Sequence, residues 1–191
     1  MHKRFASFML LLFFQPALWA QEQFSQYFTP EKKFLVLPVK NGAPKKNIEL
    51  WLNGNVIRFF DIELAEDAAD WYAYLDISAW RGKEIELRVD KMKTDALAFH
   101  PVRQSDLDST EEKPYSESMR GQIHFSPKRG WTNDPNGLCY YKGQYHLFFQ
   151  HNPYGRKWGN MTWGHAVSKD MVHWNEIGDA LHPDNFGPMF S

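Results

Sequence analysis

A nearly continuous apolar stretch lies close to the amino end of the chain. Phe5 to Phe14 is almost wholly apolar and follows the basic residues Lys3 and Arg4. A basic start, a short apolar run and a small residue, Ala20, before a polar chain are typical of a secretory signal peptide. The run is too short to span a membrane readily. We therefore predict a signal peptide over residues 1–20 and an exported protein, periplasmic or extracellular, without a transmembrane segment after its removal.

From residue 24 to residue 103, apolar and polar positions alternate in short segments, as they do in half-buried β-strands. Asn53-Gly54 lies between two of these segments and is a strong signal for a two-residue hairpin turn. The pattern predicts a small antiparallel β-sandwich-like accessory domain over residues 24–103. Trp51, Trp71 and Trp80 are expected in its core rather than on a sugar-binding surface. The predicted strands are 34–39, 48–52, 56–60, 71–77 and 84–89.

The stretch 104–120 is polar and charged, which indicates a linker. A second domain follows at 121–191. Its apolar segments predict four short antiparallel strands, a unit that resembles one blade of a β-propeller. One blade cannot close, so we predict an all-β chain that ends in an incomplete propeller. Cys139 is expected to be a buried thiol. The four segments are 138–141, 145–149, 162–168 and 172–174.

Charge and composition exclude some classes of function. The formal net charge is -1, so the sequence lacks the excess of basic residues that would predict nucleic-acid binding. Six of the eight histidines follow residue 120, but no spacing among them reproduces a zinc signature, and we predict neither a metal nor a cofactor. The glycosylation sequence Asn160-Met161-Thr162 is interpreted as incidental.

The run W-T-N-D-P-N-G, from Trp131 to Gly137, carries the candidate chemistry. It places one carboxylate, Asp134, among an aromatic ring, two carboxamides and a proline that stiffens the backbone. This mixture suits a pocket that binds a neutral polyhydroxylated ligand and attacks it with an oxygen nucleophile. The alternative is a surface turn, because Asn, Asp, Pro and Gly are common in turns for local reasons.

Glycoside cleavage normally requires two carboxyl groups, one as nucleophile or base and one as acid. Asp134 has a suitable setting for the nucleophile. Asp170 follows a lysine in a turn signal, and Glu176, Asp179 and Asp184 lie in a polar stretch that we interpret as a loop. None has the buried, aromatic setting that raises the pKa of an acid catalyst. The second carboxyl group is therefore not visible in this sequence.

Several ordered motifs after residue 121 resemble glycoside hydrolase family 32, which comprises levanases, inulinases, invertases and other β-fructosidases. The motifs are I-H-F-S-P (123–127), W-T-N-D-P-N-G (131–137), Y-H-L-F-F-Q-H-N-P (145–153), W-G-N-M (158–161), W-G-H-A (163–166) and D-M-V-H-W (170–174). The preceding β domain resembles the accessory module of some bacterial members.

The resemblance implies a five-bladed catalytic propeller and hydrolysis of β-fructofuranosidic bonds in levan, inulin or sucrose with retention of configuration. Asp134 would be the nucleophile, and Asn133 and Gln150 would bind sugar hydroxyls. Trp131 and Trp158 would line the pocket. Thr132 departs from the family, which more often has Met, Leu or Ile there. Phe190 and Ser191 would begin another pocket segment.

The family's acid/base glutamate and its transition-state-stabilising aspartate are expected beyond residue 191. We therefore expect an amino-terminal part of a fructan hydrolase, inactive by itself. The alternative is a non-catalytic fructan-binding or accessory protein.

Overall fold

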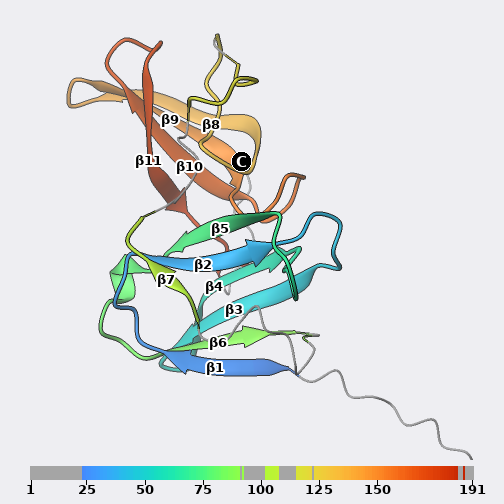
Figure 1. Ribbon diagram of the computed structural model, residues 1–191. Helices are drawn as coiled ribbons and strands as arrows, with labels where there is room; N and C mark the ends of the chain where they lie inside the picture. The colour runs from blue at the N-terminus through green and yellow to red at the C-terminus, as the bar shows by residue number, and fades with distance from the viewer. Residues whose placement is uncertain are drawn as a thin grey trace, which may run out of the picture.

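The structure is a computed structural model that describes residues 23–90, 92, 102–107, 115–121, 123–184 and 187. The predicted signal peptide, Phe190 and Ser191 lie outside these residues. Within them, the chain forms eleven strands and one short 3₁₀ helix, so the all-β class is confirmed. The strands make three antiparallel sheets (Figure 1). No closed propeller occurs in this part of the chain.

The N-terminal module, defined here as residues 23–107, contains two of the sheets. One has the strand order β1-β6-β3-β4 and the other the order β5-β2-β7. The Asn53-Gly54 turn joins β3 to β4 with both residues at positive φ, as predicted. The strands are β1 (Phe24–Phe28), β2 (Phe34–Val39), β3 (Lys46–Leu52), β4 (Asn55–Ile62), β5 (Trp71–Asp76), β6 (Ile85–Val89) and β7 (Gln104–Ser105), with the 3₁₀ helix η1 (Ser78–Trp80) after β5.

Strands β1 and β7 were not predicted. Gln104 and Ser105, which the sequence places at the start of the linker, pair with β2. The Gln104 side chain accepts hydrogen bonds from the backbone N–H groups of Glu31 and Lys32 and donates to the Thr29 carbonyl. Strand β7 forms through pairing with partners about seventy residues away along the chain, and local alternation does not reveal such partners.

The two sheets of the module face each other across a core to which both contribute. Leu37 and Leu75 from one sheet are as fully buried as Ile48 and Leu87 from the other. The predicted tryptophans lie at its margin. Trp71 and Trp80 are partly buried against the core, whereas the ring of Trp51 carries the Arg88 guanidinium at 4.1 Å.

The third sheet, called the C-terminal sheet here, has the order β11-β10-β9-β8. Lys142 and Gly143, both at positive φ, form the predicted turn between β8 and β9. The last strand begins at Trp174 rather than at Val172 and continues to Leu181. The interpretation of Glu176 and Asp179 as loop residues was therefore wrong, because both lie in β11, which pairs with β10. The strands are β8 (Trp131–Tyr141), β9 (Gln144–Asn152), β10 (Thr162–Ser168) and β11 (Trp174–Leu181).

The module and the C-terminal sheet share buried contacts. Tyr154, in the connection from β9 to β10, is 2% exposed and belongs to the core of the module, where its ring stacks on Phe60 at 3.8 Å. Asn160 accepts the backbone N–H of Asp61 at 2.8 Å and donates to the Asp61 carbonyl at 2.7 Å. The Asn160 side chain, which belongs to the glycosylation sequence, is therefore hydrogen-bonded to the backbone of the module. Figure 1 shows the C-terminal sheet against the β5-β2-β7 side of the module.

Candidate active site

The W-T-N-D-P-N-G run lies wholly inside strand β8, so the alternative that it forms a surface turn is wrong. The strand is irregular at this point. Its register against β9 shifts between Thr132 and Pro135 and again between Pro135 and Gly137. Pro135 has no N–H for a sheet ladder and is tolerated because β8 is an edge strand. The bulge around Pro135 interrupts regular pairing where Asp134 lies.

Gly130 fixes the point at which the chain enters β8. Its φ is 78°, a left-handed conformation that favours glycine. A Cβ atom at this position would clash with the backbone carbonyl of Asn152, the residue paired with Trp131. The beginning of β8 can therefore approach the end of β9 closely only with glycine here.

Two of the predicted substrate-binding residues are joined directly. The Asn133 amide donates to the Gln150 side-chain oxygen at 2.9 Å, and the Thr132 hydroxyl donates to the Gln150 backbone carbonyl at 3.4 Å. Gln150 is 6% exposed. Asp134, next to Asn133, is exposed, and its carboxylate has no hydrogen-bond or ion-pair partner within the described residues. The pair of carboxamides is thus ordered, while the carboxylate is open to a ligand.

The aromatic residues predicted to line the pocket are also accessible. Trp131 begins β8 and is 37% exposed, and Trp158 in the connection from β9 to β10 is 58% exposed. Rings with this exposure can stack on the apolar faces of sugars. Phe190 and Ser191 lie outside the described residues, so their predicted role is untested.

Asn136 is the second carboxamide of the same run and was not among the predicted substrate-binding residues. Both polar atoms of its side chain are buried, and neither has a hydrogen-bond partner within the described residues. A buried amide in this state costs about 1–3 kcal/mol relative to a bonded one. Asn136 therefore offers a donor and an acceptor that another group can satisfy.

His151 and Asp179 form a second pair that sequence reasoning missed. His151, the neighbour of Gln150 on β9, contacts the Asp179 carboxylate through Nδ1 at 2.7 Å and the Arg129 carbonyl through Nε2 at 2.9 Å. Burial alone would lower the pKa of His151, but the charge and hydrogen bond of Asp179, with the Arg129 carbonyl, raise it to about 9. The sequence signal that could have placed Asp179 on a strand is alternation of partly buried and exposed positions along β11. This alternation breaks at Gly178 and is too irregular to predict the strand.

The other carboxylates near this sheet have structural partners. Asp170 accepts the backbone N–H groups of Val172 and His173 and the His173 ring. The His173 side chain, followed by these backbone bonds, holds the pKa of Asp170 well below its usual value. Glu176 accepts the Lys128 backbone N–H at 2.7 Å. These groups stabilise loops and strands, which leaves Asp134 as the one carboxylate within residues 131–181 without a hydrogen-bond or ion-pair partner.

Cys139 is exposed, so the prediction of a buried thiol was wrong. The reason is its place on β8, an edge strand whose neighbours Leu138 and Tyr140 are also exposed. In the part of the chain that the structure describes, no three His, Cys, Asp or Glu side chains gather so that they could hold a metal ion. Nor does this part contain a helix of the length and hydropathy that a membrane crossing requires.

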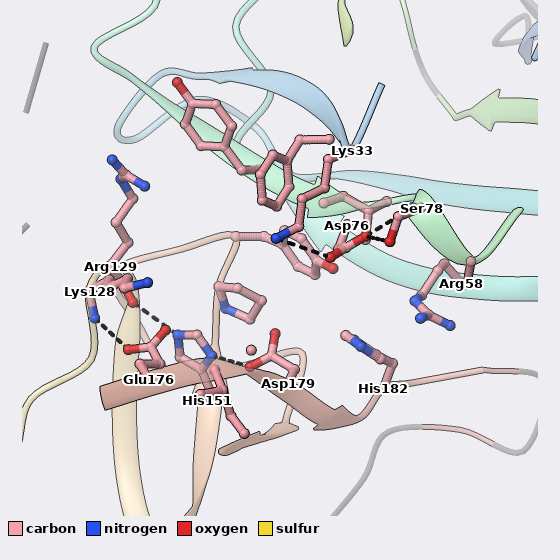
Figure 2. Close-up of a pocket in the computed structure, with 18 residues that line it drawn as sticks. Lys33, Arg58, Asp76, Ser78, Lys128, Arg129, His151, Glu176, Asp179 and His182 are labelled. Atoms are coloured by element: carbon pink, nitrogen blue, oxygen red, sulfur yellow. Dashed lines mark hydrogen bonds and ion pairs between the residues drawn. The ribbon is translucent and has the colours of Figure 1, made fainter. Parts of the chain in front are cut away.

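A cavity of 610 Å³ lies between the module and the C-terminal sheet rather than at Asp134 (Figure 2). Lys33, Arg58 and Asp76 line it from the module, and His151, Asp179 and His182 line it from the other side. The Nε atom of Arg58 and the Nδ1 atom of His182 are buried without a hydrogen-bond partner within the described residues. The cavity belongs to the boundary between the two regions and not to the candidate nucleophile.

These features define an all-β protein that presents an open carboxylate beside two linked carboxamides. Residues 124–189 match the family described as the glycosyl hydrolases family 32 N-terminal domain, and residues 21–119 match a domain of unknown function (DUF4980). The chain thus contains a DUF4980 domain, whose match covers more than half of it, followed by a glycoside hydrolase family 32 N-terminal segment over residues 124–189.

Individual relatives match part of the chain. It is 54% identical over 84 residues to a levanase of Bacillus subtilis, covering 44% of this chain and 12% of the levanase. It is 58% identical over 73 residues to an extracellular exo-inulinase of Aspergillus awamori, covering 38% of this chain and 14% of that protein. A crystal structure of the Aspergillus awamori exo-inulinase aligns with a TM-score of 0.34 and 52% identity, over 44% of this chain and 15% of the other. The chain thus spans a small part of the length of these relatives.

Proposed function

We propose that the protein to which this chain belongs is an exported β-fructosidase. It hydrolyses β-fructofuranosidic bonds in fructans such as levan or inulin, or in sucrose, with retention of configuration. The observation that carries the proposal is Asp134, an open carboxylate in the β8 bulge beside the hydrogen-bonded pair Asn133 and Gln150. The C-terminal sheet is the first blade of a five-bladed propeller in this proposal, with β8 as the strand nearest the substrate.

In this mechanism the ionised Asp134 attacks the anomeric carbon C2 of a fructosyl unit. Positive charge on the sugar ring in the transition state is stabilised by the carboxylate, and a covalent fructosyl ester forms as the leaving group departs. Water then hydrolyses the ester. Asn133 and Gln150 hydrogen-bond the sugar hydroxyls, and a site built in this way rejects ligands that lack them. Trp131 and Trp158 supply apolar faces for the sugar.

A retaining enzyme also needs an acid/base carboxyl group about 5–5.5 Å from the nucleophile. Asp170, Glu176 and Asp179 are each held by other groups. We propose that another part of the protein supplies this group. The chain alone is then expected to show negligible turnover, since losing a catalytic group commonly costs several factors of ten, each about 1.4 kcal/mol.

The test is the release of fructose by the full-length protein and by its Asp134→Asn variant, with levan, inulin and sucrose as parallel substrates. We expect a loss of at least about 1,000-fold, because the amide cannot form the ester. Asp67→Asn, which changes an exposed carboxylate of the module, is the matched control and should retain full activity. An Asp134→Asn enzyme with a tenth or more of the original rate would exclude Asp134 as the nucleophile.

A second candidate function is non-catalytic fructan binding. The structural engagement of Asp170, Glu176 and Asp179 favours it, because Asp134 is then the one carboxylate within residues 131–181 without a hydrogen-bond or ion-pair partner. Titration calorimetry with levan and inulin, together with turnover assays of the full-length protein, separates the two. Binding without any turnover by the full-length protein supports this candidate over the enzyme.

A further inference from the structure

The segment that leads into β8, residues 126–130, is held at several points; it is called the entry segment here. Arg120 donates to the Pro127 carbonyl at 2.9 Å and to the Lys128 carbonyl at 3.2 Å. The Lys128 backbone N–H donates to Glu176 on β11 at 2.7 Å. Because Asp134 follows only four residues after this segment, its position depends on where the entry segment is anchored.

His151 is the buried group that joins the entry segment to two strands. Its side chain is 5% exposed, and its two ring nitrogens face the Arg129 carbonyl and the Asp179 carboxylate (Figure 2). Both partners are acceptors only, so both bonds form together only when each ring nitrogen carries a proton. His151 also lies opposite Thr132 in the sheet, two residues before Asp134.

The N-terminal module contacts the entry segment from the other side. The guanidinium of Arg129 lies over the ring of Tyr74, on β5 of the module, at 5.0 Å. The backbone carbonyl of Arg129 therefore bonds to the His151 ring, and its guanidinium contacts the ring of Tyr74. A cation–π contact of this kind contributes about 0.5–1 kcal/mol where the groups are accessible. The module and the sheet thus fix one residue of the entry segment between them.

We infer that His151 is a positioning residue for the proposed reaction: its two ring nitrogens lock the entry segment to β11, and so set where Asp134 and Gln150 lie. The inference rests on the proposed function for its catalytic consequence. Its geometric part, the immobilisation of the entry segment, stands independently of any activity.

The charge state of His151 depends on the groups that surround it. On β11 these are Asp179 and Glu176, which favour the charged ring, and beyond the strand His182, which opposes it. Lys128 and Arg129 approach from the entry segment, and the module contributes Lys33, Arg58 and Asp76 to the same cavity. Asp179 is the closest acidic partner. Its replacement by Asn keeps an acceptor oxygen but removes the charge that offsets burial.

The experiment compares His151→Gln and Asp179→Asn in the full-length protein. With fructan as substrate, we expect His151→Gln to lower kcat about 10- to 100-fold, as a misplacement of about 1 Å can, with a change in KM below about threefold. For Asp179→Asn, burial should leave His151 neutral near pH 8, so the ratio of variant to wild-type kcat should fall as the pH rises from 6 to 8. His173→Gln changes a ring that is 87% exposed and is the control for histidine replacement.

Hydrogen exchange of the same variants is the arm that needs no activity. Amides of residues 126–137 should exchange at least about tenfold faster in His151→Gln and Asp179→Asn, while strands β2 to β6 stay protected. Unchanged exchange in residues 126–137, or an Asp179→Asn ratio that is flat with pH, overturns the positioning role. A wild-type protein without fructose release refutes the proposed function instead and leaves the exchange result to decide the positioning.

Discussion

The N-terminal module and the C-terminal sheet handle their apolar side chains in opposite ways. The module buries residues such as Leu37, Ile48 and Leu87 almost completely between two sheets. The C-terminal sheet buries a few central side chains, Phe149 and Ala166 among them, but exposes large apolar groups on both of its edge strands. The exposed ones are Leu138, Tyr140 and Tyr141 on β8 and Ile177 and Leu181 on β11.

The module therefore contributes mainly to stability, and the C-terminal sheet carries the candidate chemistry. The core of the module consists of closely packed apolar side chains, whereas the open edge strand β8 exposes Asp134 and Trp131 and holds a buried Asn136 amide that has no hydrogen-bond partner within the described residues. The two regions meet through Tyr154, which leaves the sheet and completes the core of the module. We therefore expect the module to act as a fixed support for the first strand of the site rather than as a freely moving appendage.

Among the variants that test this contrast between the module and the C-terminal sheet, Tyr154→Ala should lower the free energy of unfolding most. The ring is 2% exposed and stacks on Phe60, so its removal leaves a cavity in the core of the module and should cost about 3–5 kcal/mol of unfolding free energy. Urea unfolding followed by circular dichroism measures the loss. Tyr154→Phe keeps the stacked ring and serves as the control. A loss below about 1 kcal/mol in the Ala variant would show that the two regions are not joined through this residue.

Gly130→Ala should have the next largest effect. The residue has a positive φ, and a Cβ atom would meet the Asn152 carbonyl, so the entry into β8 has to shift. We expect a loss of about 2–4 kcal/mol, from a strained backbone together with the clash. Gly42→Ala, at similar φ but in open space, isolates the strain alone and should cost less. Equal losses in the two variants would mean that close approach at Gly130 is unimportant.

Two histidines at the boundary should make stability depend on pH in opposite directions. Burial, followed by repulsion from Arg58, lowers the pKa of His182 to about 4, so folding is disfavoured as the pH falls from about 6.5 towards 4. The pKa of His151 is raised to about 9, so its contribution is complete below about 6.5 and is lost as the pH rises through 9.

The unfolding free energy should be highest near pH 6.5 and should fall on an acid limb set by His182 and on a basic limb set by His151. Each limb should amount to about 1–3 kcal/mol. Urea unfolding at pH 4.5, 6.5 and 9 measures both limbs. His182→Asn should flatten the acid limb alone, and His151→Gln the basic limb alone. A stability that is level across this range in the unaltered chain would contradict both assignments.

The smallest effect is expected at Tyr140 on the open edge. Its ring is 65% exposed, so Tyr140→Ser should change the unfolding free energy by less than about 0.5 kcal/mol. Thermal unfolding of the variant gives the value. A large loss would mean that β8 is covered in solution, and the contrast between the closed module and the open sheet would then have to be revised.

The sequence was sufficient where local pattern decides the structure. Strict alternation predicted strands such as Glu84–Val89, and Asn53-Gly54 predicted its hairpin, because both depend on neighbours along the chain. Strand β7 was not predicted because it pairs with β2, about seventy residues away, and most of β11 was not predicted because two register shifts interrupt its pairing with the neighbouring strand β10. Cys139 was misjudged because alternation shows which residues share a face but not whether that face is covered.

At the candidate site, the sequence motifs predicted Asp134, Asn133 and Gln150, and the structure shows that the Asn133 amide donates to the Gln150 side chain. The bond between Asn133 and Gln150 requires β8 and β9 to be paired in a particular register, which the motif alone does not specify. The link from His151 to Asp179 crosses from β9 to β11 and was invisible for the same reason. Long-range pairing is what sequence periodicity does not contain.

The central claim is that Asp134 forms a covalent bond to fructose. The most direct test is to trap a mechanism-based fructosyl label on the full-length protein and to locate it by peptide mass spectrometry. The account predicts a single label on Asp134, in the peptide that contains the β8 bulge, and no label in the Asp134→Asn variant. A label on any other side chain would contradict it.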